Sequence, residues 1–315
     1  MAEEQSVLST VEAPGIGAWD CAIPIPADEY ARLAAHPRLQ AGLRALNDAS
    51  LPALAADRTL LGIFKDGGRY VSAMWAIYLH VCGGLSLQSL KTLCAQSGLL
   101  SPGRARAMLL YMRYLGYVEP APEGRGPARY LPTPRFRTAW TVHMRTVLEA
   151  ICAIEPQARA IVERLDDPDV FATIVRTQGE SLFLVARNHN LDTPLFRVFT
   201  NRHAGGLILR ELLAGSPDHV SNDAYPPRLA VLPTAADLAR RYQVSRIQVR
   251  RILTAAEKEG LIHPRVDNLW QLDDDFRAQI TLNHAMQLRH LMLSAARAAQ
   301  VLSARPPSIT RPEHF

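Results

Sequence analysis

The stretch TAADLARRYQVSRIQVRRILTAAEKEGLIHPRVDNLWQL, residues 234–272, decides the predicted fold of this chain. Its first part has apolar residues at helical spacing, and Gln243 and Val244 interrupt this pattern. Ser245, a residue type favoured at helix starts, begins a second helix in which Val249 and Ile252 lie on one buried face. The last residues read as two short strands joined by a turn. The stretch therefore predicts a helix-turn-helix followed by a β wing.

The other face of the second predicted helix carries polar and cationic side chains within its first two turns. These are Arg246, Gln248, Arg250 and Arg251. Arginine reads guanine with two hydrogen bonds and glutamine reads adenine, so such a face suits the major groove of DNA. The alternative is a solvated charged face on an ordinary pair of helices.

These residues resemble a known family. Val244 to Arg246, Val249 to Arg251 and the exit Glu259 to Ile262 are similar to the winged helix-turn-helix of the GntR-type bacterial transcription regulators. The resemblance covers about forty residues. It implies DNA contacts by Ser245, Arg246, Gln248, Arg250 and Arg251, and a phosphate or minor-groove contact by Arg265 in the wing. That family usually carries this module at the N-terminus, so its effector domain is not carried over to this chain.

A second segment, residues 85–133, has the same predicted architecture. Ser101 and Pro102 form a helix start with proline at the first helical position, and a wing follows. The segment resembles, more loosely, the winged helices of MarR-like regulators. The resemblance implies DNA contacts at the start of this helix and in the wing, by Ser101, Arg104, Arg106, Arg125 and Arg129. The same helix carries Leu110, Tyr111 and Tyr114, so the alternative is a winged helix that contacts protein.

The positive charge of the chain is unevenly distributed. The formal net charge is +5, but residues 86–137 carry +6 and residues 234–272 carry +3, which leaves −4 elsewhere. Positive charge therefore gathers at the two predicted helix-turn-helix segments, as expected for a protein that binds a polyanion.

The predicted fold class is mainly α with small β wings: tandem winged helix-turn-helix modules joined by a helical middle region. With 315 residues, of which 48% are hydrophobic, the chain is long enough for more than one core. The predicted order is an N-terminal arm with supporting helices, a first winged-helix domain, the middle region, a linker, a second winged-helix domain, a C-terminal helix and a flexible tail. Their boundaries are 1–66, 67–137, 138–215, 216–227, 228–274, 275–302 and 303–315.

Several helices are predicted outside the two modules. Separate helices are expected at 37–46 and 51–64, and a single helix at 194–214 with Gly205 and Gly206 as a close-packing or kink site. The C-terminal helix has a broad apolar face, which predicts packing on a partner subunit or back on the middle region. The N-terminal arm is expected to pack Trp19 and Ile23 onto the body of the protein.

Enzymatic, metal and cofactor chemistry are not expected. The densest polar cluster outside the modules includes Arg187, His189, Arg197 and Arg202, but no nucleophile motif, phosphate loop or metal-ligand spacing accompanies it. We expect it to cap helix ends and pair across an interface, with a pocket for a small anionic effector as the alternative. The four cysteines show no metal-binding spacing and are expected to be reduced thiols.

The sequence thus predicts a cytoplasmic, sequence-specific regulator of transcription, most consistent with a repressor, that binds double-stranded DNA without a cofactor. The alternative is a replication initiator or plasmid-maintenance protein without ATPase activity that binds repeated origin sites. A homodimer is expected, although two modules in one chain also permit a monomeric pseudo-dimer. The operator and any effector are not specified by the sequence.

Overall fold

The computed structural model describes residues 25–122, 128–188, 192–215 and 225–304. These residues are mainly helical and form two small antiparallel three-stranded sheets, which confirms the predicted fold class at that level. The arm with Trp19 and Ile23, most of the predicted linker and nearly all of the predicted tail lie outside the described residues. None of the described helices combines the length and apolar character needed to cross a membrane.

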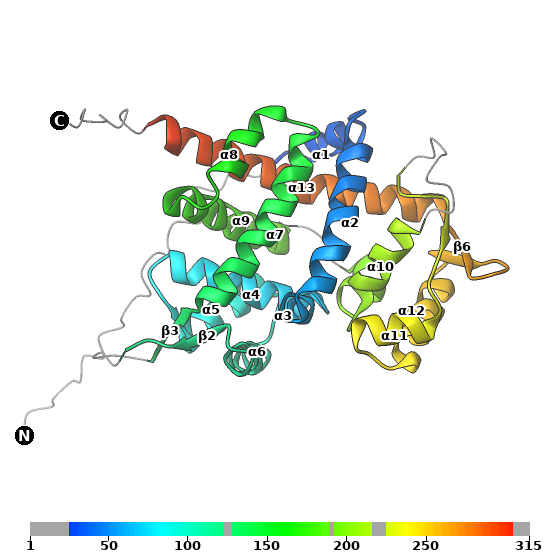
Figure 1. The fold of residues 1–315 in the computed structure, drawn as a ribbon, viewed down its shortest axis with the longest axis horizontal. Helices are drawn as coiled ribbons and strands as arrows, with labels where there is room; N and C mark the ends of the chain where they lie inside the picture. Colours follow the sequence, from blue (N-terminus) through cyan, green and yellow to red (C-terminus); the bar gives the residue numbers. More distant parts are fainter. Residues whose placement is uncertain (1–24, 123–127, 189–191, 216–224, 305–315) are drawn as a thin grey trace, which may run out of the picture.

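Three helices come first along the chain: α1 (Ala27–Ala34), α2 (Leu39–Ala56) and α3 (Arg58–Ile63). The prediction of separate helices at 37–46 and 51–64 is wrong, because α2 continues through residues 47–50 and has Pro52 inside it. Packing sustains α2 despite the missing N–H of Pro52: its buried face includes Leu43 and Leu46, and it lies along α7 (Pro134–Cys152). Figure 1 shows α2 and α7 side by side in the centre of the molecule.

The next part of the chain forms what we call the first unit. It consists of α4 (Gly67–Val81), β1 (Leu85–Ser86), α5 (Leu87–Ser97), α6 (Pro102–Tyr114), β2 (Val118–Pro120), β3 (Arg129–Pro132) and α7. Its sheet has the order β1-β3-β2, with Leu85 opposite Tyr130 and Val118 opposite Pro132. The nearly continuous apolar run of α4 is explained by burial, because Trp75, Ala76 and Ile77 are all inaccessible to solvent.

The second unit repeats this order of elements. It consists of α10 (Gly205–Ala214), β4 (Leu229–Val231), α11 (Ala235–Tyr242), α12 (Arg246–Lys258), β5 (Ile262–Pro264), β6 (Leu269–Leu272) and α13 (Asp274–Ser303). Its sheet has the order β4-β6-β5, which is the order of the first sheet. Each unit is therefore a helix, a strand, two helices, two strands and a long final helix.

The local chemistry is repeated as well. Ser101 caps α6 and Ser245 caps α12, in each case by accepting a hydrogen bond from the backbone N–H three residues later. After α6 and α12 the chain turns at Gly116 and Gly260, whose φ angles of 69° and 71° require the left-handed region that glycine tolerates. The two units thus start and stop their second inner helix by the same devices.

The two units are joined by η2 (Pro156–Ala158), α8 (Arg159–Glu163), α9 (Pro168–Asn188) and the π-helical turn η3 (Phe196–Thr200). The single helix predicted at 194–214 is wrong, since η3 ends at Thr200 and α10 begins at Gly205. Between them Ala204 has a φ of 65°, which no helix can include. The predicted close-packing role of Gly205 is supported, because a Cβ there would lie 2.3 Å from the carbonyl oxygen of Phe199.

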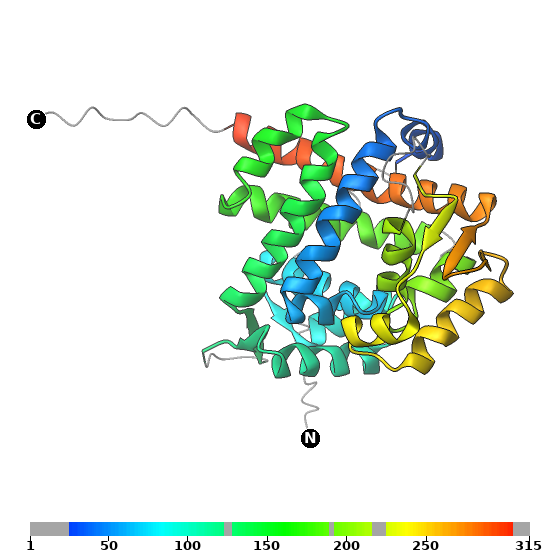
Figure 2. The same ribbon diagram turned by 45° about the vertical axis from the view of Figure 1, so that its right-hand side comes forward.

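The long helix α13 packs back on the middle region. Its most extensive contact is with α9, and it also contacts α1 and α7. Three polar links reinforce this packing: Arg297 to Glu180 at 3.0 Å, Arg289 to Glu29 and the Tyr30 hydroxyl to His290 at 3.0 Å. Figure 2 shows α13, in orange and red, along one edge of the molecule with α11 and α12 below its orange end. Much of its broad apolar face is therefore covered within the chain.

The approach of α10 to η3 generates a stability prediction. Gly205→Ala should lower the free energy of unfolding by about 1–3 kcal/mol, because the new methyl group meets backbone atoms of Phe199 that cannot rotate away. Gly103→Ala is the matched control near the start of α6, where a Cβ would have no atom within 4 Å. Urea denaturation should find Gly103→Ala unchanged or slightly more stable. Equal effects of the two changes would contradict this packing.

Candidate nucleic-acid interface

Helix α12 presents its cationic side chains to solvent because its apolar residues are buried on the opposite side. Val249, Ile252 and Ala256 are inaccessible. Arg246, Arg250 and Arg251 are exposed, in line with the expectation from their spacing. The Ser245 hydroxyl accepts the N–H of Gln248 at 3.1 Å and so fixes the start of the helix. Three guanidiniums are therefore free to reach outward from the first two turns of a capped helix.

One residue of this surface was not identified from the sequence. Ile247 is 60% exposed between Arg246 and Gln248. An exposed β-branched residue beside three arginines can contact the methyl group of thymine, which also lies in the major groove. Its helical position could have identified it as exposed, because Ile247 lies on the side of α12 opposite the buried residues Val249, Ile252 and Ala256.

Gln248 does not project outward, and this corrects its expected place on the solvent face. Its side-chain amide donates a hydrogen bond to the backbone oxygen of His203 at 3.0 Å, and the residue is half-buried. The physical reason is tertiary: η3 and the following turn pack against this flank of α12. Gln248 therefore holds α12 to the body of the protein.

The strands that follow α12 form a short hairpin with an exposed tip. Asp267 and Asn268 have φ angles of 55° and 57°, and the N–H of Leu269 donates to the oxygen of Val266 at 3.0 Å, as in a type I′ turn. Val266 at the tip is 77% exposed. The exposed Arg265 donates to the side chain of Gln271 across the hairpin. This contact draws the guanidinium toward the central strand of the sheet.

Helix α6 of the first unit presents a different surface. Ser101 caps it by accepting the N–H of Arg104 at 3.3 Å, and Arg106 is exposed. The guanidinium of Arg104 instead forms an ion pair with Asp66 at 3.3 Å, which differs from its expected groove-facing role. Arg129, expected to touch backbone phosphate, donates to the backbone oxygen of Gly83 at 3.3 Å and remains exposed. Arg125 lies outside the described residues.

Further along α6 the exposed surface becomes apolar. Leu110 is 51% exposed and Tyr114 is 85% exposed. Tyr111 turns inward instead: its hydroxyl accepts a hydrogen bond from Arg69 at 3.1 Å, and the Arg69 guanidinium lies over its ring at 4.7 Å. Among the three residues predicted as an apolar face, Leu110 and Tyr114 therefore stay open to solvent.

The carboxylate of Asp66 connects the two units. It caps α4 by accepting the N–H of Arg69 at 2.9 Å, and it forms ion pairs with the side chains of Arg69 at 3.2 Å and Arg104 at 3.3 Å. Its other contact is the Nδ1 of His203 at 3.6 Å. Burial lowers the pKa of His203, and the charges of Arg69 and Lys65 act in the same direction. His203 is thus neutral at pH 7 and completes a polar junction rather than an ion pair.

This Asp66 junction reaches both α6 and α12. Arg104 belongs to α6, while the backbone oxygen of His203 receives the Gln248 side chain from α12. The neighbouring Lys65 donates to the backbone oxygen of Gln243, the residue with a φ of 52° in the turn between α11 and α12. Two helices from different units are therefore fixed relative to each other through one buried carboxylate and its neighbours.

A second set of contacts holds the far side of α11 and α12. The buried Glu211 of α10 accepts hydrogen bonds from Arg241 and from the Tyr242 hydroxyl, both at the end of α11. Arg197 pairs with Glu259 at 3.0 Å, just after α12. Arg202 donates to the backbone oxygen of Arg251 at 3.5 Å. These contacts leave the outward face of α12 uncovered.

The expected effector pocket at Arg187, His189, Arg197 and Arg202 stays a prediction. Arg197 is already paired with Asp192 at 3.1 Å as well as with Glu259, and Arg187 lies over the ring of Phe183 at 5.7 Å. His189 lies outside the described residues. Arg197 and Arg202 do pair across an interface, between η3 and α12, as their expected structural role requires.

Metal ligands and thiols offer no further site in the described part of the chain. It contains no group of three or more His, Cys, Asp or Glu side chains arranged to hold a metal ion. Cys82, Cys94 and Cys152 are free thiols, and burial raises the pKa of Cys94 to about 12, which disfavours its reactive thiolate. Cys21 lies outside the described residues.

Comparison of the chain with protein-family models, with curated proteins and with solved structures finds no match.

The Asp66 junction generates the second prediction. Asp66→Ala should lower the free energy of unfolding by roughly 2–4 kcal/mol, because it removes a helix cap and leaves two guanidiniums without their carboxylate. Asp28→Ala is the matched control, since Asp28 pairs with Arg32 on the surface and both side chains are about 70% exposed. That change should stay within about 1 kcal/mol in the same denaturation assay. If both variants lose the same stability, the junction does not hold the units together.

Proposed function

We propose that this protein is a sequence-specific double-stranded DNA-binding regulator of transcription, a repressor, with two winged helix-turn-helix modules in one chain. One observation carries the proposal: α12 is a Ser-capped helix with three exposed arginines, within a unit whose helix and strand order recurs at α6. A helix, a strand, two helices and a two-stranded wing is the element order that a winged helix requires.

In this proposal α12 enters the major groove and reads bases. Arg246 and Arg250 lie on the exposed side of its first two turns, and Ile247 lies between them. The positive end of the helix dipole at Ser245 favours a backbone phosphate there. The exposed Arg265 of the hairpin is proposed to contact the backbone beside the groove, in exchange for its contact with Gln271. Gln248 takes no part in base reading while it is bonded to His203.

The two modules contribute unequally. At the start of α6, Arg106 is exposed and has no charged partner among the described residues, whereas the charge of Arg104 is balanced by Asp66. The exposed Leu110 and Tyr114 give the rest of α6 an apolar surface. We therefore assign the main base reading to α12, and to α6 a weaker contribution through Arg106 and the DNA backbone. A protein contact through Leu110 and Tyr114 is the alternative for the first module.

A replication initiator without ATPase activity is the second candidate. The observation in its favour is the repeat itself, because two like modules joined through Asp66 suit two adjacent copies of a repeated site. Mapping of binding sites across the genome separates the candidates. Sites at promoters support the regulator, and clustered repeats at one origin support the initiator.

The expected homodimer now rests on a smaller surface. Much of the apolar face of α13 packs on α9, so Leu110 and Tyr114 remain as its principal basis. Light scattering measures the oligomeric state directly. The protein concentration should be on the order of tens of micromolar, a range in which weak association is detected. A monomer there favours one chain acting as a pseudo-dimer.

Salt dependence provides the third prediction. If both modules hold phosphates, the logarithm of the affinity for a specific duplex should fall linearly with the logarithm of salt concentration, with a slope of about −0.9 per phosphate contacted. Arg106→Ala should reduce the slope by about one unit, and Arg159→Ala, an exposed change on the distant α8, should leave it unaltered. A flat salt response excludes DNA binding as the main activity.

The fourth prediction separates base reading from backbone holding. Arg250→Ala should cost about 1–3 kcal/mol on the cognate duplex and relax the preference at one base pair. Arg265→Ala should weaken binding to cognate and scrambled duplexes alike, because a phosphate contact carries no sequence information. Both are titrated at one fixed salt concentration, with Arg159→Ala as the control. Unchanged operator binding by Arg250→Ala would show that α12 is not in the groove.

A further inference from the structure

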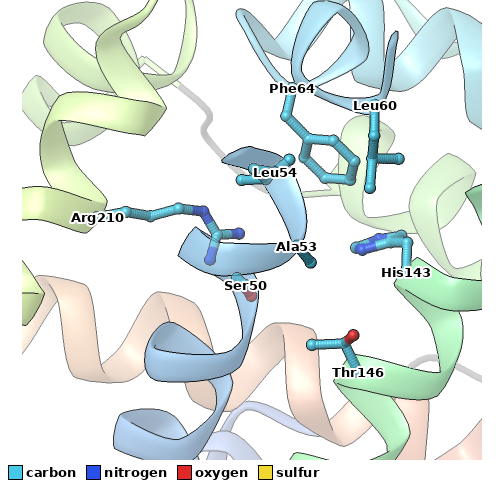
Figure 3. Close-up of a pocket in the computed structure, with 8 residues that line it drawn as sticks. All are labelled: Ser50, Ala53, Leu54, Leu60, Phe64, His143, Thr146 and Arg210. Atoms are coloured by element: carbon cyan, nitrogen blue, oxygen red, sulfur yellow. The ribbon is translucent and has the colours of Figure 1, made fainter. Parts of the chain in front are cut away.

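A small polar niche lies between α2, α3, α7 and α10, away from the outward face of α12. Figure 3 shows the Arg210 side chain extending from α10 toward α7, where the ring of His143 points back at it and Thr146 lies below. Phe64 and Leu60 form the apolar roof, and Ser50 of α2 forms the floor. The niche is partly open and has room for about one water-sized group, with a volume of about 10 Å³.

The guanidinium of Arg210 has no partner within the described structure. Fourteen ion pairs and the side-chain hydrogen bonds of the described residues include neither a carboxylate nor an acceptor for it. Its backbone oxygen is occupied, since it accepts the Asn47 amide at 3.1 Å. Burial of the guanidinium lowers its pKa, which means that the surrounding protein disfavours its charge. An arginine side chain that is partly withdrawn from water and has no counter-ion is unfavourable.

The groups around Arg210 cannot supply the missing negative charge. Burial, and after it the charge of Arg210, lowers the pKa of His143 to about 3 and that of His284 to about 4, so both rings are neutral. Burial raises the pKa of Tyr70 to about 12 and also raises that of Tyr225, so neither phenol ionises near neutral pH. The positive charge of the niche therefore remains uncompensated.

The hydroxyl groups of the niche are oriented by the helices that carry them. Ser50 donates to the backbone oxygen of Leu46 at 2.6 Å, and Thr146 donates to that of Val142 at 3.0 Å. Neither hydroxyl hydrogen is then free for a ligand. Arg210 and the neutral imidazole of His143 are left as the donors that face the cavity.

We propose that this niche binds the carboxylate head of a small organic acid through the guanidinium of Arg210. The planar fork of arginine matches a carboxylate with two parallel hydrogen bonds, and such charge-assisted pairs are the strongest available to a buried cation. The enclosed space holds about one water-sized group and the niche is partly open, so one carboxylate oxygen would enter beside Arg210 while the rest of the acid lies in the open mouth. The aromatic and aliphatic roof at Phe64 and Leu60 favours an acid with a short apolar body.

The niche adjoins the contacts that hold the second module. Glu211, the residue after Arg210, binds Arg241 and Tyr242 at the end of α11. A carboxylate that neutralises Arg210 alters the field at Glu211 and the position of α10, and so acts on α11 and α12. This regulatory consequence rests on the proposed function, whereas the binding of the acid does not.

The binding test uses the full chain without DNA. Sodium acetate and sodium benzoate should raise the melting temperature, by an amount on the order of 5 °C at saturation, when compared with sodium chloride at equal ionic strength. Acetamide and benzamide, the uncharged analogues, should have no effect. Arg210→Met should abolish the carboxylate-dependent rise and, because the uncompensated charge is gone, should melt no lower than the unmutated protein in chloride. Arg159→Met on the surface of α8 is the matched control and should retain the rise.

A second variant keeps the test decisive if Arg210→Met does not fold. Arg210→Lys retains the charge but not the fork, so its carboxylate-dependent rise should shrink at least severalfold. Equal responses to acetate and chloride, or an acetate response that survives in both Arg210 variants, overturn the site. If carboxylates bind but the affinity for DNA does not change, the site is supported and its regulatory role is excluded. If the unmutated protein binds no DNA in any assay, the proposed function is overturned while the carboxylate site stands.

Discussion

The arrangement of the two units depends on one buried carboxylate, that of Asp66. It lies just before α4 and contacts Arg69 in α4, Arg104 in α6 and His203 before α10. Because Asp66 is buried, moving α6 away would leave charges unpaired, and moving the His203 turn away would remove the remaining polar contact of the carboxylate. His203 in turn holds Gln248 of α12 through its backbone oxygen. The geometry between α6 and α12 follows from these contacts more than from any extended apolar interface between the two helices.

The two units share the same arrangement of elements but differ in the residues that they expose. Both have the same sheet order, the same serine caps and a left-handed glycine at the same point. Their inner helices differ in what remains exposed: three arginines and Ile247 on α12, Arg106 and two large apolar residues on α6. A shared scaffold with unequal surfaces supports the proposed difference between α12 as the main base reader and α6 as the lesser contributor.

The sequence predicts the parts of the fold that depend on local rules. The Ser245 cap, the buried stripe of α12 and the hairpin after it follow from spacing and turn chemistry, and the structure has them. Strands β1 and β4 were not predicted, because two or three residues carry no alternation and pairing with distant strands creates them. The roles of Arg104 and Gln248 differ for the same reason: their partners, Asp66 and His203, are 38 and 45 residues away along the chain. The sequence does not mark Arg210 as a candidate binding residue, because the lack of a counter-ion for an arginine in an apolar helix is visible only in the folded structure.

Selection of bound sequences from a pool of random duplexes tests DNA reading by two coupled modules most directly. Because the Asp66 junction fixes α6 and α12 relative to each other, the selected duplexes should share a specific block of base pairs read by α12. A second, weaker block should lie at one fixed spacing from it. Asp66→Ala should keep the first block and lose the fixed spacing. A pool that shows no enriched sequence after selection would contradict DNA reading, and two blocks at freely varying distances would contradict the rigid coupling.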